Sequence, residues 1–174
     1  RREMADRLNR ACALCSGPFP HADIAIQGTL EAWLDVYPAL EVEDRLRVSL
    51  TESRSADSEN NKAPIGPHRS DLHVVHVEKG QPANLCSTGE QKALLIAIVL
   101  ADARLRAAER DAAPLLLLDE VAAHLDGARR EALFEEIFEL GAQVWLTGTD
   151  QSVFSSMQSK AQFLDVRDGQ ANLL

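Results

Sequence analysis

The pattern of hydrophobic and polar positions changes character near residue 72. Before it, residues 1–16 and 29–37 carry apolar side chains at helical spacing, and prolines stop each stretch. Residues 45–51 (RLRVSLT) alternate between polar and apolar positions, which predicts a strand. The polar, aromatic-free residues 53–64 are typical of a mobile surface loop.

From residue 72 onward the pattern predicts strands and helices in alternation. The longest predicted helix covers residues 87–110, and its middle is apolar on nearly every side, so most of it should be buried. The unbroken leucines at 115–118 predict a short strand of the kind buried in parallel sheets. The other predicted elements are a strand at 72–77, a helix at 127–140, a strand at 143–147 and a final hairpin that turns at Asp168-Gly169. This order predicts the α/β fold class.

Composition sets limits on the function. With 174 residues and a hydrophobic fraction of 45%, the chain can bury the core of one domain. Its net charge of −9 argues against general attraction to nucleic acid, so a DNA contact needs a local basic patch. No apolar run reaches the roughly 18–20 residues of a membrane span, and three cysteines in a charged chain favour a reducing cytoplasm. A basic patch could come from a set of arginines that otherwise form a solvated face: Arg1, Arg2, Arg7, Arg10, Arg45 and Arg47.

The stretch LLLLDE, at residues 115–120, joins an apolar run to two adjacent carboxylates. In a parallel α/β sheet, ligands collect at the carboxyl ends of the strands, which is where these acids stand. We expect Asp119 to help hold a hydrated Mg²⁺, an ion that takes few protein carboxylates. Glu120 would orient or deprotonate an attacking water. The alternative is a strand that simply ends in a solvated acidic turn.

A second candidate site lies at the start of the long helix. Ser87 is a natural helix cap and Glu90 follows three residues later, which is a capping box. Gly89 lies in the first turn, where glycine costs about 1 kcal/mol relative to alanine. A small residue there lets another molecule approach the free amide groups, and a helix start of this kind suits phosphate.

Further on, Asp126 would cap the next predicted helix. Taken together, CSTGEQ (86–91), LLLLDE and AAHLD (122–126) resemble the signature motif, the Walker B motif and the D-loop of ABC-type ATPases. The chain is most similar to the C-terminal part of the RecF family, SMC-like proteins of bacterial recombination and repair. GPHRSDL (66–72), STGEQKALLI (87–96) and DEVAAHLD (119–126) also carry this resemblance.

The resemblance implies a fold and a domain division. Residues 72–174 would form the C-terminal lobe of an ABC-type (P-loop NTPase) ATPase head, and residues 1–71 a helical arm with its return to the head. The chain contains no G-x-x-x-x-G-K-[ST] phosphate loop, so the N-terminal phosphate-loop lobe is absent from it. We therefore expect that the chain alone neither binds ATP tightly nor hydrolyses it.

The resemblance also implies a function. Such proteins are cytoplasmic, bind ATP and DNA, including single-stranded/double-stranded junctions, and form homodimers on ATP. With RecO- and RecR-type mediators they help to load recombinase at single-strand gaps, in replication, recombination, repair and the SOS response, with no membrane partner. The resemblance implies that Ser87, Thr88 and Gly89 contact the γ-phosphate of ATP held by the opposite protomer. It also implies that Asp126 contacts the dimer partner. Gln91 is the residue that continues the signature motif.

One position departs from the ABC pattern. These ATPases usually carry a histidine after the strand that follows the D-loop helix, whereas here Gly148, Thr149 and Asp150 follow that strand. Thr147 or Thr149 could give a phosphate a neutral hydroxyl donor, or Thr149 and Asp150 could only cap the next short helix. The rival function is a nucleotide-independent module that docks a repair partner or dimerises through the arm. A transporter subunit fits the sequence less well.

Overall fold

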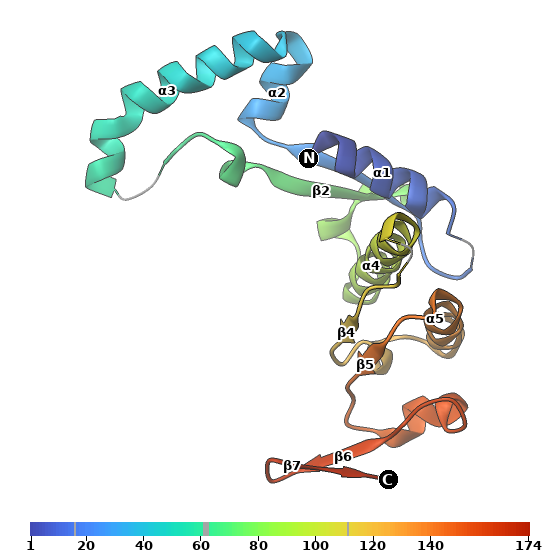
Figure 1. Ribbon diagram of the computed structural model, residues 1–174. Coiled ribbons are helices and arrows are strands. Elements are labelled where there is room, and N and C mark those ends of the chain that lie inside the picture. Colours follow the sequence, from blue (N-terminus) through green and yellow to red (C-terminus); the bar gives the residue numbers. More distant parts are fainter. Residues whose placement is uncertain (16, 61–62, 111) are drawn as a thin grey trace.

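The computed structural model of the chain describes residues 1–15, 17–60, 63–110 and 112–174, which together form an open arc (Figure 1). Its α-helices are α1 (Arg2–Ala13), α2 (Thr29–Val36), α3 (Ala39–Asn60), α4 (Thr88–Arg110) and α5 (Gly127–Leu140). Its strands are β1 (Ala22–Gln27), β2 (Asp71–His76), β3 (Gln81–Pro82), β4 (Leu116–Leu118), β5 (Val144–Leu146), β6 (Leu164–Arg167) and β7 (Gln170–Leu173). Strands β1, β2 and β3 form an antiparallel sheet, β4 and β5 a parallel pair, and β6 and β7 a hairpin.

Helix α4 lies between two hydrophobic cores. On one side it packs with α1 and the antiparallel sheet, in a cluster that includes Leu94 and Ala101. On the other side Ile96 and Leu100 join a second cluster with β4 and α5. This double packing explains why the sequence of α4 is apolar on nearly every side. The prediction that most of this helix is buried holds only for its middle, since seven of its 23 residues are buried and Leu95 is exposed.

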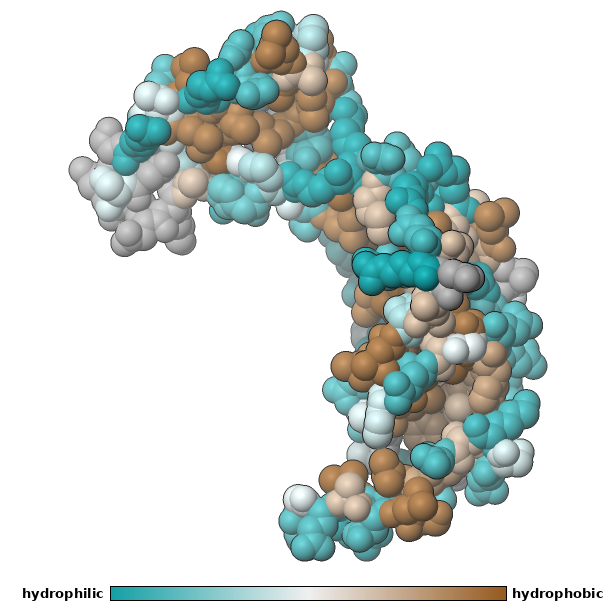
Figure 2. Space-filling model, in the orientation of Figure 1, coloured by the Kyte–Doolittle hydropathy of each residue, from teal (hydrophilic) through white to brown (hydrophobic). Residues whose placement is uncertain are grey.

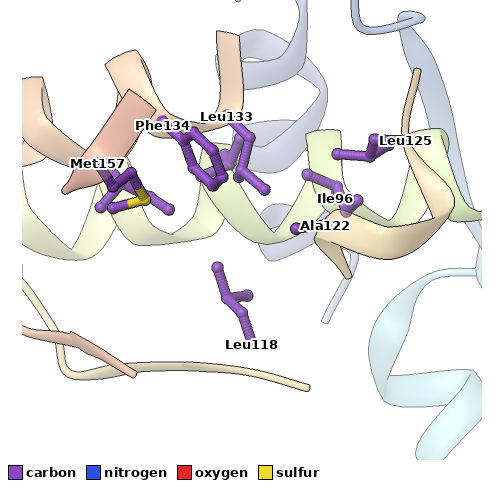
Figure 3. Close-up of a cluster of buried hydrophobic side chains, with 9 residues drawn as sticks. Ile96, Leu118, Ala122, Leu125, Leu133, Phe134 and Met157 are labelled. Atoms are coloured by element: carbon purple, nitrogen blue, oxygen red, sulfur yellow. The ribbon is translucent and has the colours of Figure 1, made fainter. Parts of the chain in front are cut away.

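The second core fixes the end of the parallel pair. Leu118 of β4, Leu133 and Phe134 of α5 and Met157 converge in it (Figure 3). Leu133 has no exposed surface, so α5 is held firmly over the strands. After β5, the backbone of Gly148 approaches the ring of Phe154 so closely that a Cβ atom would lie 2.7 Å from it. Glycine at this position therefore lets the chain leave β5 close to the core.

The first core also anchors β1. The side chain of Asn9 in α1 donates a hydrogen bond to the Ile24 carbonyl (2.8 Å) and accepts one from the Ile24 amide (2.7 Å). A side-chain amide thus replaces a neighbouring strand at this point, which satisfies backbone groups that would otherwise be unpaired at the sheet edge.

Most elements predicted after residue 72 are confirmed. The strand at 72–77 corresponds to β2, the long helix to α4, and the helix at 127–140 to α5 with the same bounds. The strands predicted at 115–118 and 143–147 are β4 and β5, parallel to each other. The final hairpin turns at Asp168 and Gly169, both with positive φ. The α/β fold class is therefore correct.

The predictions for residues 45–60 are wrong, whereas residues 63 and 64 of the predicted loop lie outside helices and strands. Residues 45–51 lie inside α3, not in a strand, and α3 continues to Asn60 through the predicted loop. Ion pairs one helical turn apart support α3, since Arg45 pairs with Glu41 and Arg47 with Glu43, each at 2.9 Å. An alternating pattern of only seven residues favours a strand less strongly than these ion pairs favour a helix. Residues 61 and 62 of the predicted loop lie outside the described residues.

Helices α2 and α3 project from the rest of the molecule as an arm (Figure 1). They are inserted between β1 and β2, which pair along their whole length from Ala22↔His76 to Gln27↔Asp71. Strand β1 was not predicted from the sequence. Helix α1 and β1 pack against α4 and β2, so in space they lie with the elements that follow residue 72 and not with the arm. The division into residues 1–71 and 72–174 stays a prediction.

The arginines considered as a basic face are mostly held by acids. In the described part of the chain Arg2 pairs with Asp35 and Arg7 with Glu109, in addition to the pairs of α3. Paired charges of this kind attract phosphate weakly, which favours the solvated-face interpretation. Within the described ranges no helix is long and apolar enough to cross a membrane.

Candidate functional site

The two acids of LLLLDE stand at the end of the parallel pair, beside the end of the neighbouring strand. Strands β4 and β5 are in register from Leu116↔Val144 to Leu118↔Leu146, so Asp119 and Thr147 leave the sheet side by side. The Thr147 hydroxyl donates a hydrogen bond to Oδ1 of Asp119 (2.5 Å). The hydroxyl oxygen of Thr147 also accepts a hydrogen bond from the backbone N–H of Glu120 (2.9 Å). One hydroxyl group therefore contacts both acidic residues.

The backbone at Glu120 adopts a conformation that side-chain-bearing residues rarely use. Its φ angle is +54°, in the left-handed region. A residue other than glycine held there costs on the order of 1 kcal/mol or more, and such strain is common at functional sites. The core residues Leu118 and Ala122, on either side of the acids, hold the chain in this turn (Figure 3).

The chemistry of Asp119 fits a magnesium ion. Its side chain is exposed, and Thr147 engages Oδ1, which leaves Oδ2 without a protein donor among the described residues. No group of three or more His, Cys, Asp or Glu side chains in the described ranges could hold a metal. A single carboxylate suits Mg²⁺, because this ion keeps several waters and takes other oxygens from phosphates. Asp119 with Glu120 beside it therefore fits a hydrated cation that arrives with a nucleotide.

The start of α4 has the predicted capping box. The backbone N–H of Ser87 donates to Oε2 of Glu90 (3.0 Å), and the Glu90 N–H donates to the Ser87 hydroxyl (3.4 Å). At Gly89 an added Cβ would meet no atom within 4 Å. Glycine is thus not required there by packing within this chain. The open surface over the first turn of α4 leaves room for a group from outside, as an anion site would need.

A lysine next to the capping box was not predicted. Lys79 forms an ion pair with Oε1 of Glu90, while Oε2 serves the box. The hydrogen bond from Lys79, assisted by those from Ser87, lowers the pKa of Glu90 to about 2. Lys79 also cancels a negative charge in the helix turn where an anion would dock. It lies in the turn that connects β2 to β3, so the antiparallel sheet and the start of α4 are connected here.

We expect Lys79→Met to raise the pKa of Glu90 towards its ordinary value of 4.5. Because the pKa of Glu90 is lowered in the folded chain, the ionised carboxylate stabilises the fold above pH 4.5, and this contribution is lost as pH falls towards 2. In Lys79→Met this contribution should be smaller, and its loss should be complete at a higher pH than in the parent chain. NMR titration of the Glu90 side-chain carboxyl measures this shift.

The matched control for this titration is Lys160→Met, because Lys160 lies over the Phe138 ring, away from Glu90. It should leave the Glu90 titration as in the parent chain. An unchanged Glu90 titration in Lys79→Met would contradict the assigned ion pair.

Two of the other four predicted site residues, Asp126 and Gln91, serve local structure in this chain. Asp126 caps α5, with its carboxylate accepting from the Arg129 amide (2.9 Å). Gln91 turns back and donates to the Cys86 carbonyl (2.9 Å). Thr88 and Thr149 are exposed, and within the described ranges neither side chain has a hydrogen-bond partner. Thr88 and Thr149 are therefore available to contact a second molecule.

The residue that caps the segment after β5 is Asp150. Its carboxylate accepts from the Ser152 amide (2.8 Å), as proposed in the capping alternative. Hydrogen bonding from the Ser152 side chain, and then from its amide, lowers the pKa of Asp150. Thr149 takes no part in that cap. In the part of the chain that is described, no hydrogen bond or ion pair joins residues 87–89 to Asp119 or Glu120. Within the described ranges, the two candidate sites are therefore not joined by any direct polar contact.

The parallel pair is bare on one face. Leu116 and Leu118 are buried, whereas Leu117 is 72% exposed and Trp145, its neighbour on β5, is 51% exposed. Each strand also has one unpaired edge in the described structure. Hydrophobic surface lies on the inner side of the arc near these strands (Figure 2). Large apolar side chains and free strand edges in one place indicate a contact surface for more polypeptide.

Comparisons with known proteins show which proteins the chain is similar to. No protein-family model matches the chain. It is 53% identical over 154 residues to the DNA replication and repair protein RecF of Mesorhizobium japonicum and 51% identical over 154 residues to that of Brucella abortus. To that of Rhizobium etli it is 47% identical over 171 residues. The chain is similar to the C-terminal part of RecF. These alignments cover 88%, 88% and 97% of the chain but 41%, 40% and 46% of the RecF proteins, so the chain spans less than half of their length.

Solved structures of RecF have the same fold. Two structures of the recombination mediator protein RecF in the RecFOR pathway, RecF-ATPrS and RecF-ATP, match 99% of the chain with TM-scores of 0.69 and 0.64. They are 20% and 19% identical to it, and the match covers 45% and 46% of their chains. A structure of the Smc head bound to the C-winged helix domain of ScpA has a TM-score of 0.56 over 99% of the chain, at 17% identity and with 43% of that chain covered. The fold is that of a partial ABC ATPase lobe.

Proposed function

We propose that the chain is the signature-bearing lobe of an ATP-dependent DNA repair protein that dimerises when it binds ATP. The observation that carries this proposal is the pair of surfaces at the start of α4 and the end of β4. One offers open helix amides for phosphate, and the other offers a carboxylate pair for a cation and a water. No direct polar contact joins these surfaces among the described residues of one chain, and in the proposed dimer each nucleotide contacts one surface from each of two chains.

Within such a dimer each residue has one task. Ser87, Thr88 and Gly89 of one protomer face the γ-phosphate of ATP held by the other. Asp119 holds Mg²⁺, which would neutralise phosphate charge when bound with ATP. Glu120 orients or deprotonates the attacking water, and Asp126 contacts the partner protomer beside it. The phosphate loop belongs to another part of the RecF protein, so this chain by itself neither binds ATP tightly nor hydrolyses it.

The bare face of β4 and β5 supports a missing lobe. Leu117 and Trp145 would be covered by that lobe in a complete RecF protein, and the free edges of the two strands would pair with its strands. That other lobe would carry the nucleotide pocket, and its contact with β4 and β5 would bring the pocket close to Asp119 and Glu120.

The biological role follows the relatives' names. We propose that the protein acts in the cytoplasm, in DNA replication, recombination, repair and the SOS response, and binds DNA at single-stranded/double-stranded junctions. ATP binding would close the dimer on DNA, and hydrolysis through Glu120 would release it. With RecO- and RecR-type mediators it would help to load recombinase at single-strand gaps. The similar solved structures are of a recombination mediator protein in the RecFOR pathway, which supports this role.

The test is ATP-dependent dimerisation of a full-length RecF chain that contains these residues. With ATP and Mg²⁺ the parent chain should dimerise, and Ser87→Arg should abolish dimerisation because a long cationic side chain would fill the space over the first turn of α4. Light scattering with and without ATP measures the mass. The control is Ala108→Arg, which adds the same long cationic side chain at the exposed far end of α4 and should still dimerise.

The rival function is a nucleotide-independent module that docks a repair partner or dimerises through the arm. The exposed apolar side chains on α2 and α3, including Val36, Leu40 and Val48, favour it. Partner binding or dimerisation that ignores both ATP and Ser87→Arg would establish the rival and refute the first proposal.

A further inference from the structure

The residue after β5 connects the two acids at the end of β4. Thr147 is 28 residues from Asp119 in sequence, yet its hydroxyl donates to the Asp119 carboxylate. The backbone N–H of Thr147 also donates to the Leu118 carbonyl (3.1 Å), so the residue is tied to β4 through its main chain as well. A side chain anchored in this way has little freedom to turn elsewhere.

Hydrogen-bond capacity decides what Thr147 can do. A threonine hydroxyl has one proton to donate and two lone pairs. The proton goes to Asp119, and one lone pair accepts the amide of Glu120. No proton remains for a phosphate oxygen, so in this arrangement Thr147 does not replace the switch histidine as a phosphate donor. Thr147 and Thr149 were the two candidates for that role. Of these two, only Thr149 has a hydroxyl without a hydrogen-bond partner within the described ranges.

The accepted amide belongs to a strained residue. The φ angle of +54° at Glu120 is unfavourable for a glutamate, so something must hold the turn. The hydrogen bond from the Glu120 amide to Thr147 stabilises this turn directly. Without it, the backbone of Glu120 is free to relax, and its carboxylate moves relative to Asp119.

We infer that Thr147 is a positioning residue that sets the relative placement of Asp119 and Glu120, a role that rests on the proposed function of these acids. It orients the Asp119 carboxylate through Oδ1, which leaves Oδ2 directed to a cation. It fixes the Glu120 turn through the amide. A displacement of about 1 Å in a reacting group costs up to about 100-fold in rate, which gives the size of the expected effect.

The experiment compares three variants in a full-length RecF chain that contains these residues. Thr147→Val keeps the shape and removes the hydroxyl, Thr147→Ser keeps the hydroxyl, and Ser156→Ala removes an exposed hydroxyl outside the site, in the segment that follows β5. Hydrogen–deuterium exchange of the Glu120 amide reports the turn without any need for ATP. Steady-state kinetics report kcat and KM for ATP.

We expect Thr147→Val to speed exchange at the Glu120 amide about 10-fold or more and to lower kcat about 10- to 100-fold with an unchanged KM. Thr147→Ser and Ser156→Ala should match the parent chain in both measurements. Parent-like exchange or parent-like kcat in Thr147→Val would overturn the inference, as would equal losses in either of the other two variants.

Failure of the proposed function gives a different result. If Glu120→Gln leaves turnover intact, the acids do not act as proposed, and the kinetic measurement loses its meaning. Exchange at the Glu120 amide still decides whether Thr147 holds the turn. The two failures are therefore distinguishable in the same set of proteins.

Discussion

Glu120→Gln is expected to lower ATP turnover of a full-length RecF chain by about 100- to 10,000-fold, the range associated with loss of a general base. Glutamine has nearly the same shape, so the turn at Glu120 and its amide bond to Thr147 should persist. ATP binding should persist too, because the phosphate contacts proposed here lie at Ser87 to Gly89 on the partner protomer. ATP-driven dimers should then accumulate, since their release requires hydrolysis. Steady-state turnover and light scattering measure the two effects.

The matched control for Glu120→Gln is Glu139→Gln. Glu139 is exposed on α5, in the same lobe, and lies outside the site. It should leave turnover and dimerisation as in the parent chain. Turnover of Glu120→Gln within a few-fold of the parent would remove Glu120 from the chemistry and leave the acid pair as a solvated turn.

Gly89→Val should weaken ATP-dependent dimerisation about 5- to 150-fold, the equivalent of the roughly 1–3 kcal/mol that an overpacked contact costs. Within its own chain an added Cβ at Gly89 meets no atom within 4 Å, so the fold itself should tolerate the change. Replacing glycine near the start of a helix should even raise stability, by up to about 1 kcal/mol in the Gly89→Ala variant. Replacing Gly89 should therefore leave the fold at least as stable as in the parent chain while it weakens ATP-dependent dimerisation. Thermal denaturation measures the first, and light scattering with ATP measures the second.

The control for Gly89→Val is Ala108→Val, at the exposed far end of the same helix. It adds two methyl groups to α4 away from the proposed phosphate site and should not affect dimerisation. If Gly89→Val dimerises on ATP as strongly as the parent, no nucleotide approaches the first turn of α4, and the signature role of this segment is wrong.

Strong periodicity made the second half of the fold predictable. Helices α4 and α5 are long and capped at recognisable residues, Ser87 before α4 and Asp126 before α5, so local sequence and tertiary packing agree. The strand leading to Asp119 was predictable because an unbroken leucine run suits burial on both faces. In this chain, however, Leu117 on the second face is exposed.

Short or weak patterns failed. The alternation at residues 45–51 predicted a strand, but ion pairs such as Arg45–Glu41 stabilise a helix there. Strand β1 escaped prediction because it follows a proline-rich segment and depends on a distant partner, β2, and on the side chain of Asn9. Neither contact is visible in the local sequence.

By itself the sequence determined which residue types carry the chemistry, because the capping box, the open glycine and the adjacent acids are local features of consecutive residues. Only the tertiary structure decided what holds them in place. Thr147 reaches Asp119 across 28 residues and Lys79 reaches Glu90 across 11, and both contacts arise from strands and turns brought together by folding. Such contacts depend on the direction of a side chain in space, and spacing along the chain does not encode that direction.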